Sequence, residues 1–240
     1  AKPDGYTILF VSSSTTVLDP VLRANLPYDV SKDLVAGCGV FKVGNVMNMS
    51  ATLPFGTAAD FIAAAKAEPE KYSFGYSTAT TRLAGEMFQQ EAGIRLLGVP
   101  YKGSAGGLTD VAAGLVHLFF IDTVSAEPHY RSGRIKPLLV AGNRRLKPIP
   151  TVPTAAEAGF PGYDIAPSAA TWFPANTPPE ILKAARAAID AALRSPEYSA
   201  VLAKHSVDHY PVCGDDLTRS TAEEVARWEG IAQKAGIQKQ

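Results

Sequence analysis

The chain has 240 residues, of which 46% are hydrophobic and 19% are charged, a balance typical of a globular protein with one or two domains. Lysine plus arginine and aspartate plus glutamate number 23 each. Without an excess of basic residues there is no broad surface to neutralise a phosphate backbone, so we expect no nucleic-acid partner. No apolar run reaches the roughly 18 residues that a membrane-spanning helix needs.

The two cysteines, Cys38 and Cys213, lie in no C-x-x-C or ligand-spaced cluster, so we expect neither a metal site nor a cofactor. A disulfide between them can form in an oxidising compartment, but spacing does not place their Cα atoms. The favoured expectation is two buried free thiols. The N-terminal AKPDGYT lacks the features of a signal peptide, and because an exported protein loses its signal at maturity, this decides nothing about location.

Short β-prone runs and helices alternate through most of the chain. We expect strands at residues 6–11, 72–76, 96–99, 116–121 and 135–140 and an extended region at 39–49. Thr57 is the expected N-cap of a helix through Lys66, and a second helix, 82–92, ends at Gly93. Strands separated by helices of this length predict right-handed crossovers and parallel pairing.

After Pro178 the pattern becomes helical. Pro178 and Pro179 start a helix, and a last helix follows near the end of the sequence. Apolar residues recur at helical spacing in both, at Ile181, Ala185, Ile189 and Leu193 and at Leu217, Val225, Trp228 and Ile231. These stripes predict packing faces.

Hydroxyl side chains gather where the first strand ends, at Ser12 to Thr16. Ser13, Ser14 and Thr15 can donate hydrogen bonds to a ligand. The alternative is that they cap a helix or close a turn.

A second polar segment, GYSTATTRLA at 75–84, joins a strand to a helix. Ser77, Thr78 and Thr80 offer hydroxyls at a helix start, where free N–H groups carry partial positive charge and favour a carboxylate. Arg82 can add a charge-assisted pair. The alternative is an arginine on the solvent face of the first turn.

The same segment supports an enzyme hypothesis, because Gly75 to Ala79 approximates the G-x-S-x-G nucleophile elbow of α/β hydrolases. Ser77 would be the nucleophile. Asp122 or Asp190 with His205 or His209 would satisfy the chain order of a triad. The last glycine is replaced by alanine and no HGGG segment precedes the elbow, so the expectation is that the protein is not an enzyme.

A third polar segment starts at Tyr101, where YKGS follows a strand and precedes a helix. Gly103 lets a ligand approach the backbone, Ser104 can cap the helix, and Tyr101 can give a phenolic hydrogen bond. Asp122 ends the next strand. It can accept a hydrogen bond from a hydroxyl or amine, or cap the helix that follows.

Motifs across nearly the whole chain resemble the receptors of tripartite tricarboxylate transporters, periplasmic solute-binding proteins also called Bug proteins. The motifs are PDGYT (3–7), LPYD (26–29), LAGEMF (83–88), VPYKGS (99–104) followed by LTD and a strand ending in Asp122, VPTAAEAGFPGY (152–163), TWF (171–173), NTPPE (176–180) and AGI (235–237). Members of this family also match one another over an earlier strand, Gly-rich loop and helix, which this sequence does not contain.

The resemblance implies an α/β fold of the two-lobed, type II periplasmic-binding-protein kind, with parallel-rich sheets flanked by helices and a hinge of two crossovers. Residues 1–46 with 170–240 would form the first lobe and residues 47–169 the second. Trp172 would lie at the hinge and contribute to the ligand site, and the alternative is that its indole forms part of the core.

The function that the resemblance implies is extracytoplasmic capture of a small carboxylate-bearing metabolite for a tripartite tricarboxylate-type transporter. Its partners would be the organic acid and the membrane subunits of the transporter, with the receptor a periplasmic monomer. The alternatives are the hydrolase, a ligand-sensing partner of a signalling protein, and a truncated remnant that binds nothing. The sequence identifies no particular acid.

Overall fold

The protein is described by a computed structural model that covers residues 1–205, 207–234 and 239. The chain forms two compact units, Ala1–Val43 with Pro167–Gln240 and Gly44–Ala166. The resemblance predicts that the chain passes from one lobe to the other after residues 46 and 169. The boundaries between the two observed units lie after residues 43 and 166. The AGI motif at 235–237 lies outside the described residues.

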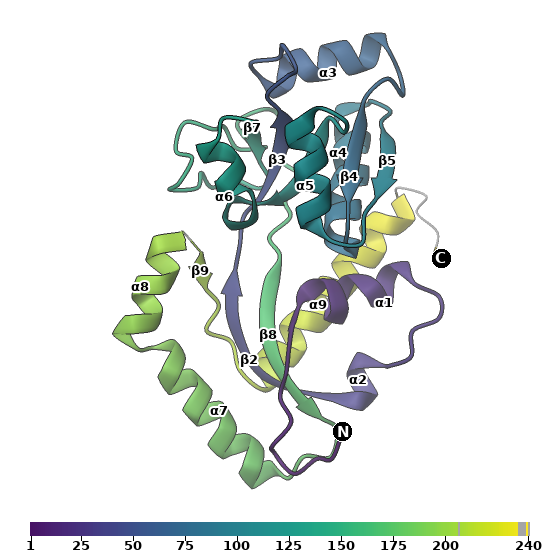
Figure 1. The fold of residues 1–240 in the computed structure, drawn as a ribbon. Coiled ribbons are helices and arrows are strands. Elements are labelled where there is room, and N and C mark those ends of the chain that lie inside the picture. The colour runs from purple at the N-terminus through teal and green to yellow at the C-terminus, as the bar shows by residue number, and fades with distance from the viewer. Residues whose placement is uncertain (206, 235–238, 240) are drawn as a thin grey trace. The chain divides into compact units, whose positions relative to one another are not determined.

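The first unit is built on a sheet whose strands come from both parts of the chain (Figure 1). In the described residues its order is β1-β8-β2-β9. The strands are β1 (Leu9–Ser12), β8 (Ser168–Pro174), β2 (Leu34–Lys42) and β9 (Asp208–His209). All of their pairings are antiparallel. The two connections between the units lie side by side, since Val43 N donates to Pro167 O at 2.8 Å.

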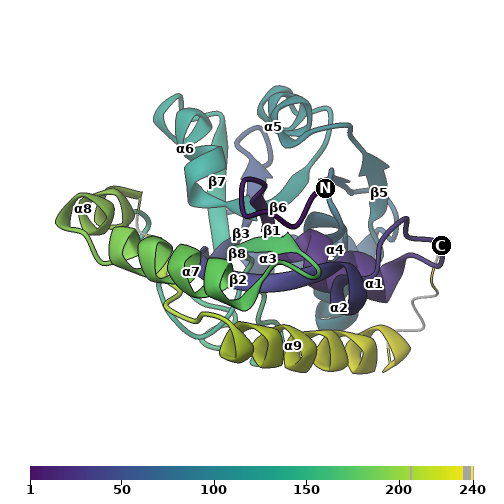
Figure 2. The ribbon, with the colours of Figure 1, turned by 90° about the horizontal axis from the view of Figure 1, so that it is seen from below.

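Helices flank this sheet, and Figure 2 shows α9 running alongside α1. The helical segments are η1 (Ser14–Leu18, a short π-helix), α1 (Asp19–Leu22), α2 (Val30–Asp33), α7 (Pro179–Leu193), α8 (Pro196–His205) and α9 (Asp215–Lys234). Both α7 and α9 pack on β2. The predicted stripes are confirmed as packing faces, with Leu193, Leu217 and Trp228 buried.

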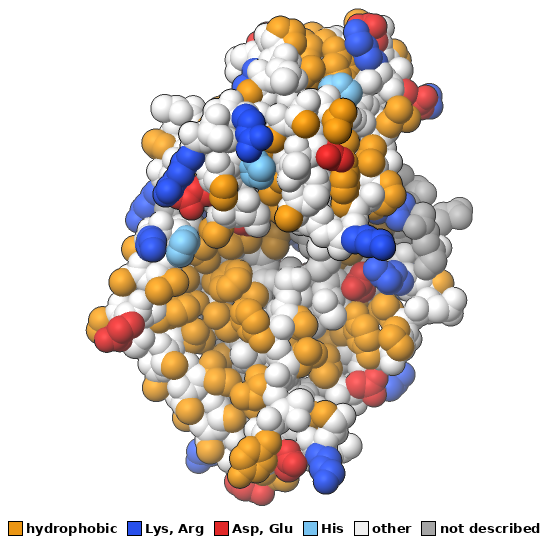
Figure 3. Space-filling model, viewed as in Figure 1, with side chains coloured by type: hydrophobic (Ala, Val, Ile, Leu, Met, Phe, Trp, Pro, Cys, Tyr) orange, Lys and Arg blue, Asp and Glu red, His pale blue; other side chains and the backbone are white. Residues whose placement is uncertain are grey.

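Strand β1 is an edge of the first sheet and is apolar on its outer surface. Leu9 and Phe10 are exposed, as is Ile8 just before them. Figure 3 shows hydrophobic side chains over much of the visible face of the first unit, with charged side chains mainly at its margins. Single exposed apolar residues are ordinary, but a run of them on a strand edge is a surface that favours association.

The second unit alternates strands and helices around one mixed sheet. In the described residues its strand order is β5-β4-β6-β3-β7. The elements are β3 (Asn45–Ser50), α3 (Ala58–Ala67), β4 (Ser73–Tyr76), α4 (Ala79–Ala92), β5 (Leu97–Pro100), α5 (Ser104–Ala113), β6 (Leu118–Asp122), α6 (Thr123–Arg131) and β7 (Ile135–Val140).

The α/β class is confirmed, and the expected parallel pairing of helix-separated strands holds for part of this sheet. Among the described strands, β4 pairs in parallel with β5 and with β6. Strand β3 lies between β6 and β7 and is antiparallel to both. Alternation of strands and helices predicts that the strands run in one direction, and β4, β5, β6 and β7 do so. The alternation does not predict that β3 lies between β6 and β7 in the opposite direction.

Capping residues that the sequence marks lie at the ends of two helices. Thr57 caps α3 in a capping box with Asp60, as predicted. Gly93 ends α4 with a left-handed φ of 63°, a conformation that suits glycine. The predicted start of α4 at Arg82 is wrong, because Thr78 caps the helix and Ala79 begins it.

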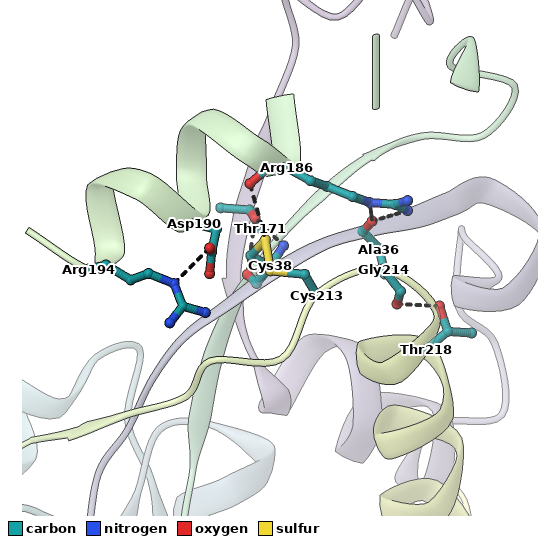
Figure 4. The surroundings of a disulfide bond; sticks show 9 residues. All are labelled: Ala36, Cys38, Thr171, Arg186, Asp190, Arg194, Cys213, Gly214 and Thr218. Atoms are coloured by element: carbon teal, nitrogen blue, oxygen red, sulfur yellow. Dashed lines mark hydrogen bonds and ion pairs between the residues drawn. A yellow bond between two sulfur atoms is a disulfide. The ribbon is translucent and has the colours of Figure 1, made fainter. Parts of the chain in front are cut away.

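The expectation of free thiols is also wrong, because Cys38 and Cys213 form a disulfide with their Cα atoms 4.0 Å apart (Figure 4). The bond joins β2 to the segment just before α9. Thr171 holds both backbone groups of Cys38, accepting from its N at 2.8 Å and donating to its O at 3.0 Å. Arg186 of α7 donates to Ala36 O through Nε at 2.9 Å and Nη2 at 2.6 Å. The burial of Cys38 agrees with the expectation, whereas these neighbours were predictable only from the fold.

Each helix in the described part of the chain is too short or too polar to span a lipid bilayer.

Removing the disulfide is expected to destabilise the first unit. The bond closes a sequence separation of 175 residues, so its loss frees the unfolded chain, at a cost of about 2 to 5 kcal/mol. Urea unfolding of the double variant Cys38→Ser, Cys213→Ser should therefore show a lower midpoint than wild type. Wild type in reducing buffer should behave like the variant. Equal midpoints in oxidising buffer would contradict the bond.

Candidate functional site

Polar side chains gather within the second unit at the carboxyl ends of β4, β5 and β6. Helices α4, α5 and α6 begin at the same edge, directly after these strands. The first N–H groups of a helix have no partner inside it and carry partial positive charge. Converging helix starts at the carboxyl edge of parallel strands form the usual location of an anion or small-ligand site in α/β proteins.

Packing around Phe119 of β6 brings the starts of α4 and α5 together. A Cβ on Gly75 of β4 would lie 2.7 Å from Phe119 Cδ2, and one on Gly107 of α5 would lie 2.2 Å from Phe119 Cε2. Both distances are shorter than real Cβ contacts, so these two positions require glycine. The absence of a Cβ at both glycines thus lets the fully buried Phe119 ring pack directly against β4 and α5.

The structure brings Ser77 and Ser104 into contact, as sequence reasoning placed them at one site. Ser77 Oγ and Ser104 Oγ are 2.7 Å apart, and both side chains are partly buried. Either oxygen can be the donor, so the pair keeps a second hydrogen-bonding valence for a ligand. Gly103, the N-cap of α5, has extended backbone and no side-chain cap from the described residues. A Cβ there would meet none of the described atoms within 4 Å, so this helix start is open.

Thr78 and Thr80 differ in their surroundings. Thr78 is the N-cap of α4 and forms a reciprocal capping box with Thr81, whose N donates to Thr78 Oγ1 at 3.2 Å. Capping of α4 therefore accounts for the Thr78 hydroxyl. Thr80 is 6% exposed, and its Oγ1 has no hydrogen-bond partner among the described residues.

Arg82 lies on the second turn of α4 and is partly buried. Its guanidinium carbon is 5.8 Å from the centre of the Tyr76 ring, within the range of a cation–π interaction. Tyr76 is the last residue of β4, so the positive charge is at the same edge as Ser77.

Tyr101 points its hydroxyl to α5, the helix that begins three residues later. The hydroxyl donates to Asp110 Oδ2 at 2.6 Å. Asp110 lies in the second turn of α5. Burial, and then the Asp110 carboxylate, raise the pKa of Tyr101 to about 12, so the phenol stays protonated at neutral pH. Its ring edge lies near Gly75 and Phe119.

Asp122 ends β6 and caps α6. Its Oδ1 accepts from Ser125 N at 2.8 Å and its Oδ2 from Ser125 Oγ at 3.0 Å. The capping alternative is thus observed, and it leaves acceptor capacity on both oxygens. In the register of the sheet Asp122 is opposite Asn45, the first residue of β3. Sequence reasoning missed Asn45, although a polar residue opening the apolar run NVMNM was a signal.

Ser13, Ser14 and Thr15 lie in the first unit, at the junction of β1 and η1. Ser13 is buried, and its Oγ accepts from Ser168 N at 3.1 Å, which ties the start of β8 to this junction. Ser14 is buried as well, and Thr15 O accepts from Tyr28 OH at 2.9 Å. These contacts match the turn-forming alternative, and a ligand role for the three residues stays a prediction.

Trp172 of β8 is 3% exposed and packs with Ala36, Tyr210 and Leu217. Its Nε1 has no hydrogen-bond partner among the described residues. The indole also borders a groove of about 880 Å³ in the first unit, formed by the segments from η1 to β2 and by α9. The core interpretation of Trp172 is observed. Its contribution to a ligand site stays a prediction.

The hydrolase alternative gains no support from the bonds of its proposed triad. Within the described residues Ser77 Oγ is bonded to Ser104, and no hydrogen bond joins it to a histidine. Asp122 caps α6, and Asp190 pairs with Arg194 at 2.7 Å. No group of three or more His, Cys, Asp or Glu side chains in the described chain could hold a metal ion.

Comparison with known proteins agrees with the geometry. The sequence profile described as "Tripartite tricarboxylate transporter family receptor" matches residues 1–237. A UPF0065 protein of Bordetella bronchiseptica is 33% identical over 182 residues, 76% of this chain and 54% of that protein. Protein BugT of Bordetella pertussis is 30% identical over 236 residues, 97% of this chain and 72% of BugT. The chain thus spans just over half the length of the first of these relatives.

Solved structures share the fold. "R. palustris Rpa4515 with adipate" superposes with a TM-score of 0.94 at 31% identity, covering 100% of this chain and 81% of that chain. "Structure of periplasmic binding protein BugD" superposes with a TM-score of 0.92 at 24% identity, covering 100% of this chain and 81% of that chain. The second likeness shows the fold alone.

Breaking the capping box of α4 is expected to cost stability. Thr78→Ala removes the acceptor for Thr81 N and should lower the free energy of unfolding by about 0.5 to 2 kcal/mol. Thr78→Ser keeps the acceptor and should stay close to wild type in urea unfolding followed by circular dichroism. If alanine and serine behave alike, the capping hydrogen bonds do not stabilise this helix.

Proposed function

Because the chain belongs to the tripartite tricarboxylate transporter receptor family, we propose that it is a solute-binding receptor that captures a small carboxylate-bearing metabolite. One observation carries the proposal within the structure. The starts of α4 and α5 meet at one edge of the second unit, joined by the contact between Ser77 and Ser104. Open N–H groups and hydroxyls at such an edge suit a carboxylate.

The residues proposed to hold the ligand are those that sequence reasoning selected. In the second unit they are Ser77, Thr78, Thr80, Arg82, Tyr101, Gly103, Ser104 and Asp122, and in the first they are Ser13, Ser14, Thr15 and Trp172. The hydroxyls and N–H groups would bind the carboxylate, and Arg82 would add charge-assisted hydrogen bonds. Every step is non-covalent, so the proposal includes no catalysis.

The ligand class is supported by a relative of known structure. The Rpa4515 protein, 31% identical, is described with adipate, a carboxylate. That the two units act as lobes that close on a ligand is part of the same proposal. The adjacent connections, joined by the hydrogen bond from Val43 N to Pro167 O, suit a hinge.

We propose the periplasm as the location and the membrane subunits of a tripartite transporter as the partner of a monomeric receptor. The family is one of periplasmic receptors, and the disulfide fits an oxidising compartment. Equal numbers of acidic and basic residues give no argument for a nucleic-acid partner.

A screen of organic acids should reveal ligand-induced stabilisation. An acid present at about 100 times its Kd should raise the free energy of unfolding by about 2.7 kcal/mol, because it binds only the folded state. Thermal unfolding with a panel of mono-, di- and tricarboxylates measures this, and isothermal titration calorimetry gives Kd for each hit. Flat titrations and unshifted melting for every acid would refute the proposal.

Arg82 and Tyr101 are expected to matter for a confirmed ligand. Loss of a charge-assisted hydrogen bond in Arg82→Ala should weaken binding by about 1.5 to 3 kcal/mol, roughly 10- to 150-fold in Kd. Tyr101→Phe should weaken binding less, since its hydroxyl is already bonded to Asp110. Arg95→Ala is the matched control, because Arg95 pairs with Glu70 on the surface. Unchanged affinity in both test variants would remove these residues from the site.

A further inference from the structure

We propose that His117 and Ser73 form an acid-sensitive latch between β6 and β4, which is closed while the imidazole is neutral and opens when the imidazole takes up a proton. The latch lies within the second unit, at the end of the sheet opposite the candidate ligand site. The inference goes beyond the proposed function, and its test needs no ligand.

His117 joins three neighbouring strands of the second sheet. It is the residue immediately before β6, which lies between β4 and β3. Its backbone oxygen accepts from the N of Ser50, the last residue of β3, at 2.9 Å. Its Nδ1 lies 3.0 Å from the N and 2.9 Å from the Oγ of Ser73, the first residue of β4. One imidazole thus ties the start of β4 to the start of β6.

The hydrogen bond from Ser73 N determines which ring nitrogen carries the proton. A backbone N–H can only donate, so Nδ1 must be unprotonated and the proton of the neutral ring lies on Nε2. In the imidazolium both nitrogens are donors. The Ser73 hydroxyl can turn to accept from Nδ1–H, but Ser73 N would then face another donor and lose its acceptor. Protonation of the ring therefore opens the latch.

Loss of this hydrogen bond matters because the ladder between β4 and β6 is short. In the described residues it pairs Phe74 with Leu118 and Gly75 with Phe119. The latch continues this pairing by one residue toward the start of both strands. Ser73 is buried, so its N–H would be costly to leave without an acceptor. We therefore expect an open latch to loosen the start of β4.

Aromatic side chains pack around the imidazole. The Tyr72 ring is nearly perpendicular to it, at 84°, with the ring centres 5.2 Å apart. Phe55 and Phe61 pack on Tyr72 in turn, with ring centres 5.8 and 5.2 Å from it. An apolar environment of this kind disfavours the charged form of histidine.

The titratable groups that face the imidazole come from the segment before β4. They are the Tyr72 phenol and the Lys71 ammonium, which is paired with the Glu68 carboxylate. Burial of the ring, and then the positive charge of Lys71, lower the pKa of His117 below its ordinary value of 6.5. The unfolded chain takes up this proton near that ordinary value. Stability that is present above it is therefore lost as the pH falls through the lower pKa of the folded protein.

Two substitutions separate the hydrogen-bond acceptor from the titrating ring. His117→Asn keeps an acceptor, because Asn Oδ1 can replace Nδ1, and does not titrate. His117→Phe keeps an aromatic ring and has no acceptor at any pH. Hydrogen exchange of the Ser73 amide, followed by NMR in the intact protein, measures how well the latch protects this N–H group.

The protection of the Ser73 amide should depend on pH in wild type. It should decrease between about pH 8 and about pH 5, by up to about tenfold per pH unit, the slope for uptake of one proton. In His117→Asn it should change by less than about twofold over the same range, because no proton is taken up at this position. In His117→Phe it should be low throughout. Wild type should thus resemble the asparagine variant at the high pH and the phenylalanine variant at the low pH.

His129→Asn is the matched control, because His129 is the other histidine of the second unit and lies near the end of α6. This variant should keep the pH dependence of wild type. Equal pH dependence in wild type and His117→Asn would overturn the inference, as would a wild-type Ser73 amide with constant protection.

Wild type alone decides the question if a variant fails to fold. The chemical shift of the Ser73 amide should then follow the protonation of the His117 ring, with one common pKa below the ordinary value of histidine. Separate midpoints for the amide and the ring would show that protonation does not act on this hydrogen bond and would overturn the inference.

Discussion

The contact of Phe119 with two glycines is the constraint on which the candidate site depends. Its buried ring occupies the space that a side chain at Gly75 or Gly107 would need. Because both positions are glycine, β4 and α5 both pack against this one ring, and Ser104 at the start of α5 contacts Ser77 just after β4. The polar edge is thus a consequence of the apolar core beneath it. A Cβ at either glycine would meet aromatic ring carbons first, so the position of the polar edge depends on apolar packing.

The first unit depends on a different kind of constraint, because its sheet is assembled from segments far apart in the sequence. Strand β8 pairs with β1 on one side and β2 on the other, and the disulfide joins β2 to the segment before α9. Arg186 and Thr171 satisfy backbone groups around that bond. These cross-connections hold together two parts of the chain that are separated by the whole second unit.

Buried polar atoms that folding leaves without a hydrogen-bond partner indicate where a ligand could bind. Most of the hydroxyl groups predicted to bind a ligand form hydrogen bonds within the protein. Thr78 belongs to a capping box, and Ser13 Oγ accepts from Ser168 N. Thr80 Oγ1 and Asn45 Oδ1 do not have partners in the described residues. Because folded proteins rarely bury such atoms without a reason, they are more informative about a ligand than the number of hydroxyls in a loop.

The sequence alone determined the family, the α/β class, the positions of most helices and strands, and the end of the second unit at which polar residues gather. These features are local or motif-based: Thr57 and Gly93 mark helix ends through their own chemistry, and alternating strands and helices order β4 to β7. Only the tertiary structure decided the disulfide, the entry of β3 between β6 and β7, and the pairing of Asn45 with Asp122. Each of these joins residues distant in the chain, and periodicity and capping signals carry no information about which distant partner a residue meets.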